Sequence, residues 1–119
     1  MKNKNITISK INQITDSYQD YLLDDLQDKE SAAAYIQAAL EEFQENGKTE
    51  ILLLALRNVA KARGGIAKLA KKTHLNRESL YKTLSSKGNP KLNTLIMLLH
   101  ALGFKLSIQT IKPLIDDPY

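Results

Sequence analysis

The chain has 119 residues, no cysteine and a formal net charge of +4. This length suits one domain with a modest core, and the missing cysteines exclude disulfides and thiolate chemistry and fit a reducing cytoplasm. The longest apolar run, residues 51–56, is far too short to cross a bilayer, and no apolar run of a signal peptide follows the basic N-terminus. We therefore expect a cytoplasmic protein that does not bind a membrane.

The net charge conceals two blocks of opposite sign. Residues 57–91 carry ten basic side chains against one acid, whereas residues 16–50 carry ten acids against two lysines. A dense basic block is typical of a surface that binds phosphates. DNA would repel the acidic block, so we expect that block either to bind a basic partner or to be an ordinary solvated helix surface.

The N-terminal region gives two signals. Ile6 and Ile8 alternate with polar residues, which permits a short strand, and a flexible tail over residues 1–15 is the alternative. In residues 18–26, aromatic and apolar side chains recur at every fourth position, which predicts a short amphipathic helix.

Two longer helices follow. Asp28 is a suitable N-cap for a helix over residues 29–46, and Gly47 is a natural residue to end it. Thr49 is expected to cap the next helix, over residues 50–63. Both helices have an apolar stripe that predicts burial on one side.

Residues 64–84 predict two short helices joined by a tight turn. The first helix follows a glycine pair, the turn lies at His74, and Asn76 is a good N-cap for the second helix. Leu80 and Leu84 are spaced so that both face inward. In the helix-turn-helix that these residues resemble, the turn usually carries glycine where this chain has His74, because the backbone there often needs a positive φ. Histidine departs from that pattern but adopts a positive φ more readily than most residues do.

The outer face of the second helix is chemically able to read DNA, because Arg and Lys pair with guanine edges and Glu accepts from cytosine. The spacing resembles the helix-turn-helix of Cro and lambda-type phage repressors. That resemblance implies that Arg77, Glu78 and Lys82 contact bases. It places the phosphate and sugar contacts at Lys68, Asn76, Tyr81, Lys87, Asn89 and Lys91. The alternative is an ordinary helical hairpin with a solvated charged face.

The C-terminal part predicts one more helix and a strand. Residues 85–90 are turn formers, and residues 91–102 predict a helix that is apolar on several sides. Residues 104–111 alternate between apolar and polar, which predicts a strand. A lone strand is an unpaired edge, so it would pair with residues 5–9, with a second copy or with a partner protein. We favour a second copy, and therefore a homodimer.

No arrangement of residues suggests catalysis. His74 and His100 lie on different elements without companion ligands, so we expect no metal site. No glycine-rich phosphate loop and no nucleophile with a nearby base is present, so we expect no cofactor, no small-molecule substrate and no enzyme activity.

Residues 18–107 resemble the addiction-module antidote family, which comprises Cro/lambda-repressor-like antitoxins encoded beside a small RelE-like toxin, an mRNA-cleaving ribonuclease. The resemblance rests on NRESLYKTLS followed by GNP, on ALG at the end of the last helix, and on YL…AAYIQAAL near the N-terminus. Generic phage repressors lack that N-terminal segment. The resemblance implies a repressor that binds its own operator and a partner toxin.

We therefore expect an all-α fold: a five- to six-helix, lambda-repressor-like helix-turn-helix domain with an N-terminal helical extension and a short C-terminal strand. The expected parts are a tail (1–15), an acidic helical extension (16–47), the DNA-binding domain (48–112) and a second tail (113–119). The acidic extension is the candidate toxin-binding region, with candidate residues Tyr18, Tyr21, Asp24, Asp25 and Asp28. Two other functions stay open: a stand-alone prophage-type repressor without a toxin, and a protein-interaction module that has lost DNA binding.

Overall fold

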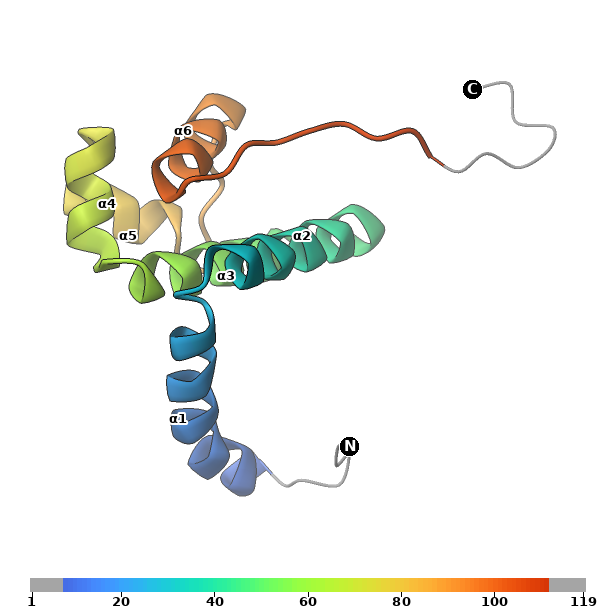
Figure 1. Ribbon diagram of the computed structural model, residues 1–119, viewed down its shortest axis with the longest axis vertical. Helices are drawn as coiled ribbons and strands as arrows, with labels where there is room; N and C mark the ends of the chain where they lie inside the picture. Colours follow the sequence, from blue (N-terminus) through green and yellow to red (C-terminus); the bar gives the residue numbers. More distant parts are fainter. Residues whose placement is uncertain (1–7, 112–119) are drawn as a thin grey trace, which may run out of the picture.

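The computed structural model describes residues 8–111, with side chains from residue 17 onward, and over this range the fold is all-helical, as predicted. The described residues form six helices: α1 (Ile8–Asp25), α2 (Lys29–Asn46), α3 (Thr49–Ala62), α4 (Gly65–Thr73), α5 (Arg77–Thr83) and α6 (Leu92–Leu102). Figure 1 shows α2 beside α3, with α4, α5 and α6 grouped at one end of this pair. The first helix projects away from the others, and the residues after α6 run outward as an extended chain (Figure 1).

Two side-chain caps and one glycine set helix ends where the sequence predicted them. The Asp28 carboxylate accepts a 2.9 Å hydrogen bond from the Ser31 backbone N–H at the start of α2. The Asn76 side chain accepts a 2.9 Å bond from the Ser79 N–H at the start of α5. Gly47 ends α2 with a φ of 74°, a left-handed conformation that glycine adopts without strain.

The predicted cap at Thr49 is wrong. Thr49 is the first residue of α3, and Lys48, which precedes it, makes no capping hydrogen bond with its side chain. The Asn46 side chain instead accepts a 2.8 Å bond from the Lys48 N–H, which stabilises the turn between α2 and α3. A side chain that ends one helix therefore shapes the entry to the next.

A single apolar core connects five of the six helices with the loop after α1. The third helix lies at its centre and packs against α1, α2 and α4, while α4 also packs against α5 and α6. The largest fully buried side chains are Leu26, Leu53, Leu56, Val59, Leu80, Leu84 and Leu98. Because α2 contributes Ala32, Ile36 and Ala39 to the same core, α2 supports α3 physically. The boundary predicted near residue 47 therefore stays a prediction about which residues bind the toxin and which bind DNA.

Two predictions at the ends of the chain need correction. Residues 8–15 are the first turns of α1, not a strand or a tail, and the spacing of Ile8 and Ile11 continues the helical repeat. Residues 104–111 are extended but form no strand, because no second strand lies beside them among the described residues. The predicted tails at residues 1–7 and 113–119 lie outside the described residues.

Candidate nucleic-acid interface

The turn between α4 and α5 has the backbone conformation that the sequence predicted. His74 adopts φ 60° and ψ 21°, and it is the one non-glycine residue with positive φ among the described residues. The buried Thr73 hydroxyl donates a 2.8 Å bond to the Leu69 carbonyl oxygen and accepts a 3.4 Å bond from the Leu75 N–H. These bonds anchor the turn to the end of α4. We call α4, residues 74–76 and α5 the α4–α5 unit.

The inner side of α5 fixes the direction of its outer side. Leu80 and Leu84 are 0% and 1% exposed, so they hold the helix against the core. Arg77 and Lys82 point away from this contact and are exposed. If these two basic side chains were buried, α5 could not read DNA as predicted. In the structure neither of them is buried.

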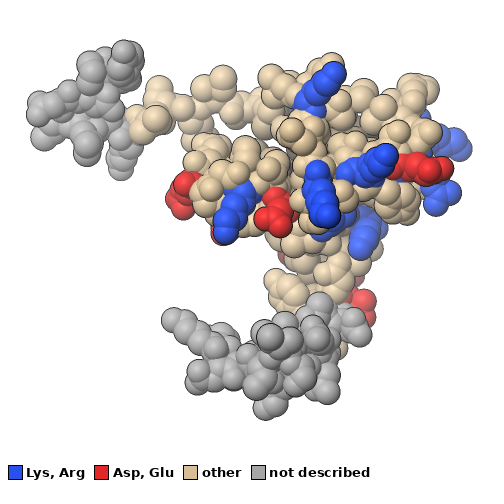
Figure 2. Space-filling model, turned by 180° about the vertical axis from the view of Figure 1, so that it is seen from behind, with Lys and Arg blue, Asp and Glu red and all other residues tan. Residues whose placement is uncertain are grey.

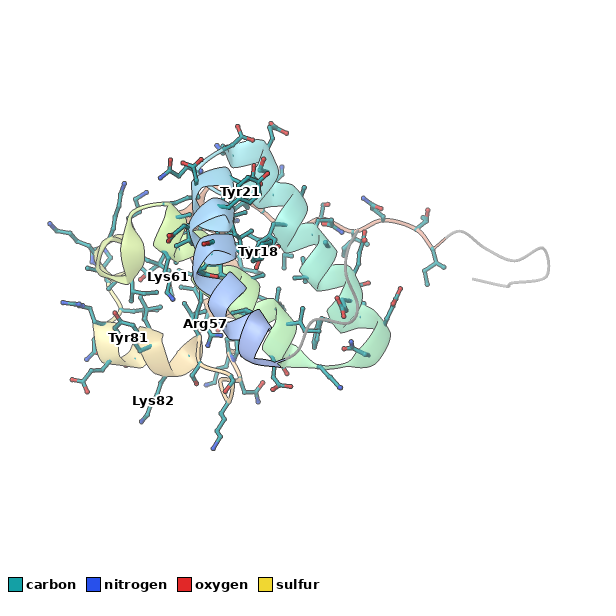
Figure 3. The ribbon with its side chains drawn as sticks, turned by 90° about the horizontal axis from the view of Figure 1, so that it is seen from below. Tyr18, Tyr21, Arg57, Lys61, Tyr81 and Lys82 are labelled. Atoms are coloured by element: carbon teal, nitrogen blue, oxygen red, sulfur yellow. The ribbon has the colours of Figure 1, made fainter. Side chains whose placement is uncertain are left out.

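The structure brings most of the predicted contact residues of α5 together. A hollow of about 580 Å³ on the outer side of the helix is lined by Asn76, Glu78, Ser79, Tyr81, Lys82 and Ser85. Tyr81 is 54% exposed, which leaves its ring available to a ligand. Figure 3 shows Tyr81 and Lys82 projecting from α5 on the face seen from below. Arg77 lies in the first turn of the same helix, outside this hollow.

Two basic residues of α3 on the same face were not singled out from the sequence (Figure 3). Arg57 Nη1 donates a 2.9 Å hydrogen bond to the Leu84 carbonyl oxygen, at the C-terminal end of α5. Lys61 lies one turn further along α3 and is exposed. The sequence could have revealed this pair, because Arg57 and Lys61 are four residues apart and residues i and i+4 share a helix face.

The loop between α5 and α6 presents the predicted residues Lys87, Asn89 and Lys91, all of them exposed. Gly88 allows this loop to pack closely on α5, because a Cβ atom at that position would lie 2.0 Å from the Thr83 carbonyl oxygen. The loop is therefore held near the end of α5, where Lys87 and Lys91 add to the basic side chains of that helix.

Lys68 lies in different surroundings. It lines a small hollow between α4 and α6 with Arg63, Lys72, Ala101 and Leu102, and this hollow shares no lining residue with the one on α5. The Arg63 guanidinium also lies 5.9 Å from the centre of the Phe104 ring. The structure therefore groups Lys68 with Arg63 and Lys72, not with the outer side of α5.

The charged side chains are not separated into two clean faces. Figure 2 shows several Lys and Arg side chains over the helical body, with Asp and Glu side chains between them. The local concentration of basic residues around α5, its following loop and α3 is therefore a better guide to a DNA-binding surface than the net charge is.

The predicted toxin-binding residues lie on α1 and at the start of α2. Tyr18 and Tyr21 are 57% and 70% exposed, and Asp24 and Asp25 are also exposed. Asp28 has a structural task as the cap of α2. Hydrogen bonds from Ser31, chiefly from its backbone N–H, hold the pKa of Asp28 below its usual value, and the Arg63 charge adds to the effect.

Neither a metal centre nor a membrane segment is found in the part of the chain that the structure describes. No group of three or more His, Cys, Asp or Glu side chains among residues 17–111 is placed to hold an ion. None of the described helices has the length and apolarity that a bilayer-crossing segment needs.

These features define a small all-helical protein with an exposed cationic helix pair. Residues 17–110 match the family described as "Probable addiction module antidote protein", and the chain belongs to that family. An uncharacterised protein of Haemophilus influenzae is 35% identical over 74 residues, which cover 62% of this chain and 75% of that relative. No solved structure is similar enough to count as a match.

Proposed function

We propose that the chain is the antitoxin of a type II toxin–antitoxin module. It binds operator DNA through a lambda-repressor-like helix-turn-helix, represses its own operon, and neutralises a RelE-like mRNA-cleaving toxin in the cytoplasm. It acts by binding, without catalysis. Membership of the antidote family supports a toxin partner in general. The observation that supports DNA binding is the α4–α5 unit, whose outer residues are exposed while Leu80 and Leu84 are buried.

The chemistry of the α4–α5 unit suggests how DNA would be read. The exposed helix α5 fits into the major groove of DNA, which is wide enough for an α-helix. There Arg77 and Lys82 pair with guanine, and Glu78 accepts a hydrogen bond from cytosine. Each good base contact contributes ~1–3 kcal/mol of discrimination. Lys87 and Lys91 neutralise phosphates and set the position of the helix. In a homodimer the two reading helices would lie ~34 Å apart, one turn of DNA.

The DNA test is a binding titration with the DNA upstream of the gene and with random DNA, each at two salt concentrations. Arg77→Ala is expected to weaken binding to the upstream DNA far more than to random DNA. Lys87→Ala is expected to weaken both equally and to flatten the salt dependence. Lys29→Ala, which removes an exposed charge from α2, is the control and should leave both curves in place. Equal losses for Arg77→Ala on both DNAs would contradict a base-reading role.

The toxin contact is proposed on α1, where two tyrosines are exposed within the acidic block. Deleting residues 1–47 is a poor test, because it also removes core side chains such as Leu26 and Ile36. The double variant Tyr18→Ala/Tyr21→Ala leaves the core intact. We expect it to lose toxin neutralisation in cells while it still binds DNA.

Arg77→Ala is the matched control, with the opposite expected pattern. If the tyrosine variant neutralises the toxin as well as the unchanged protein does, the proposed toxin contact on α1 is wrong. A gene neighbourhood without a small basic ribonuclease would favour the stand-alone repressor.

A further inference from the structure

The small hollow that contains Lys68 lies where the end of α3, the helix α4 and the end of α6 meet. It has a volume of about 80 Å³. Arg63, Lys68 and Lys72 bring three positive charges to its lining, and no described Asp or Glu side chain lines it. We call this feature the cationic hollow. It shares no lining residue with the hollow on the outer side of α5, so it needs an explanation of its own.

Two of the three cations are held in place by contacts within the chain. Arg63 Nη1 donates a 3.1 Å hydrogen bond to the Gln27 carbonyl oxygen, and its guanidinium lies beside the Phe104 ring. These contacts leave other N–H donors of the guanidinium free. The stem of Lys68 lies across Gly64, where a Cβ atom would collide with Cδ of the lysine. A ligand that meets side chains already held in this way loses less free energy to ordering them.

The start of α4 adds to the positive charge of the cationic hollow. Gly64 is the N-cap of this helix and makes no side-chain capping bond, and Gly65, the first helical residue, lines the hollow. The first N–H groups of a helix have no partner within the helix, and they carry the positive end of its dipole. The helix start therefore reinforces the charge of the three side chains.

The positive charges are crowded. Lys68 and Lys72 are four residues apart on one helix, a spacing at which like charges repel each other and destabilise the helix. Asp28 lies close enough to Arg63 to be affected by its charge, but the Asp28 carboxylate caps α2 and does not line the hollow. An anion within the hollow would remove this repulsion.

The size and charge of the cationic hollow restrict the choice of anion. A space of about 80 Å³ holds one tetrahedral oxyanion but not a nucleoside. A phosphate in DNA has a sugar on both sides and a single negative charge, so it needs an open surface. A phosphate monoester has one substituent and a charge of about −1.5 to −2 at neutral pH, which suits three cations better. Inorganic phosphate has the same chemistry without a substituent.

We propose that the cationic hollow binds a free phosphate group, either inorganic phosphate or the terminal phosphate of a small phosphorylated molecule. Arg63, Lys68 and Lys72 donate charge-assisted hydrogen bonds to its oxygens, and the start of α4 faces the same negative charge. Because these residues belong to α3 and α4, the ligand ties the first helix of the α4–α5 unit to α3. This inference does not depend on DNA or toxin binding.

The first test is calorimetric titration of the full chain with inorganic phosphate and with adenosine 5′-monophosphate, at constant ionic strength in chloride. Lys68→Gln and Lys72→Gln should each raise the dissociation constant about tenfold or more, the effect of losing a charge-assisted hydrogen bond. Lys71→Gln is the matched control, because Lys71 is an exposed lysine of the same helix that does not line the hollow. It should leave the dissociation constant nearly unchanged. Circular dichroism should show the same helix content in all four proteins.

Two further compounds show which part of the ligand is recognised. Adenosine, which lacks the phosphate, should not bind, and the dinucleotide thymidylyl-thymidine, whose phosphate is a diester, should bind about tenfold more weakly than the monoester. Equal affinities for inorganic phosphate and the monoester, or a preference for either, would identify the source of the phosphate group. The proposal is overturned if millimolar phosphate gives no binding, if Lys71→Gln weakens binding as much as Lys72→Gln does, or if adenosine or the diester binds as well as the monoester.

The second test separates the cationic hollow from the proposed DNA surface. Lys68→Gln should leave the salt dependence of binding to the upstream DNA unchanged, whereas Lys87→Ala is expected to flatten it. A flatter curve for Lys68→Gln would assign this lysine to the DNA backbone and overturn the proposal. If the chain binds no DNA at all, the proposed function fails, and the phosphate titrations still decide this inference.

Discussion

Arg57 and Asn58 are consecutive residues of α3 whose side chains bind three other helices. Arg57 Nη1 donates a 2.9 Å hydrogen bond to the Leu84 carbonyl oxygen at the end of α5. Asn58 Oδ1 accepts a 3.0 Å bond from the Gln19 side chain on α1, and Asn58 Nδ2 donates a 2.9 Å bond to the Tyr35 hydroxyl on α2. One turn of α3 therefore positions both the proposed DNA-reading helix and the proposed toxin-binding helix.

Replacing Arg57 by alanine should lower the free energy of unfolding by about 1–2 kcal/mol, because the partly buried Leu84 carbonyl oxygen loses its donor. Lys61→Ala is the matched control, since it removes the same charge one turn further along α3 from an exposed side chain. Its effect on stability should stay within about 0.5 kcal/mol. Urea denaturation measures both, and equal losses would show that the Arg57 hydrogen bond does not stabilise α5.

Replacing Asn58 by alanine should cost about 1–3 kcal/mol, because Asn58 is buried and bonds to both α1 and α2. Tyr35→Phe removes only the bond to α2 and should cost about 0.5–1.5 kcal/mol. Amide hydrogen exchange separates the two effects. Asn58→Ala should accelerate exchange in α1, and Tyr35→Phe should do so much less. Unchanged exchange in α1 of the alanine variant would mean that the Gln19 contact does not hold this helix in place.

The features that the sequence predicted well depend on residues close together in the chain. The cap at Asn76 reaches three residues forward, and Leu80 and Leu84 lie one helical turn apart, so the α4–α5 unit could be predicted from local spacing alone. The positive φ at His74 was expected from the resemblance to a helix-turn-helix, not from local spacing.

The features that the sequence could not predict join distant residues. Arg57 and Leu84 are 27 positions apart, and Gln19 and Asn58 are 39 apart, so no periodicity relates them. The strand predicted over residues 104–111 failed for a related reason. Alternation specifies which side chains share a side, but it does not supply a neighbouring strand.

The stability of the protein should depend on the ionisation of Asp28. Folding lowers the pKa of Asp28 below its ordinary value, because the carboxylate accepts hydrogen bonds from Ser31. A group whose pKa is lowered by folding stabilises the fold above its unfolded pKa and loses this contribution as the pH falls through the folded pKa. We therefore expect the stability advantage of the unchanged protein over Asp28→Asn to be present at neutral pH and to disappear in acid. Urea denaturation of both proteins between neutral and acidic pH measures this difference in the free energy of unfolding. A difference that does not change with pH would contradict the role of the Asp28 charge.

Glycine at position 74 should stabilise the protein. His74 is exposed and holds φ at 60°, a conformation that costs a residue with a Cβ atom roughly 1–2 kcal/mol. Glycine also gains freedom in the unfolded chain, so the net increase for His74→Gly should be about 0.5–1 kcal/mol. His74→Ala keeps the Cβ atom and should change little, whereas His74→Val adds a branch at Cβ and should destabilise the turn. Thermal and urea unfolding rank the four proteins. If His74→Gly is less stable than the unchanged protein, then the imidazole must make a stabilising contact that outweighs the backbone strain.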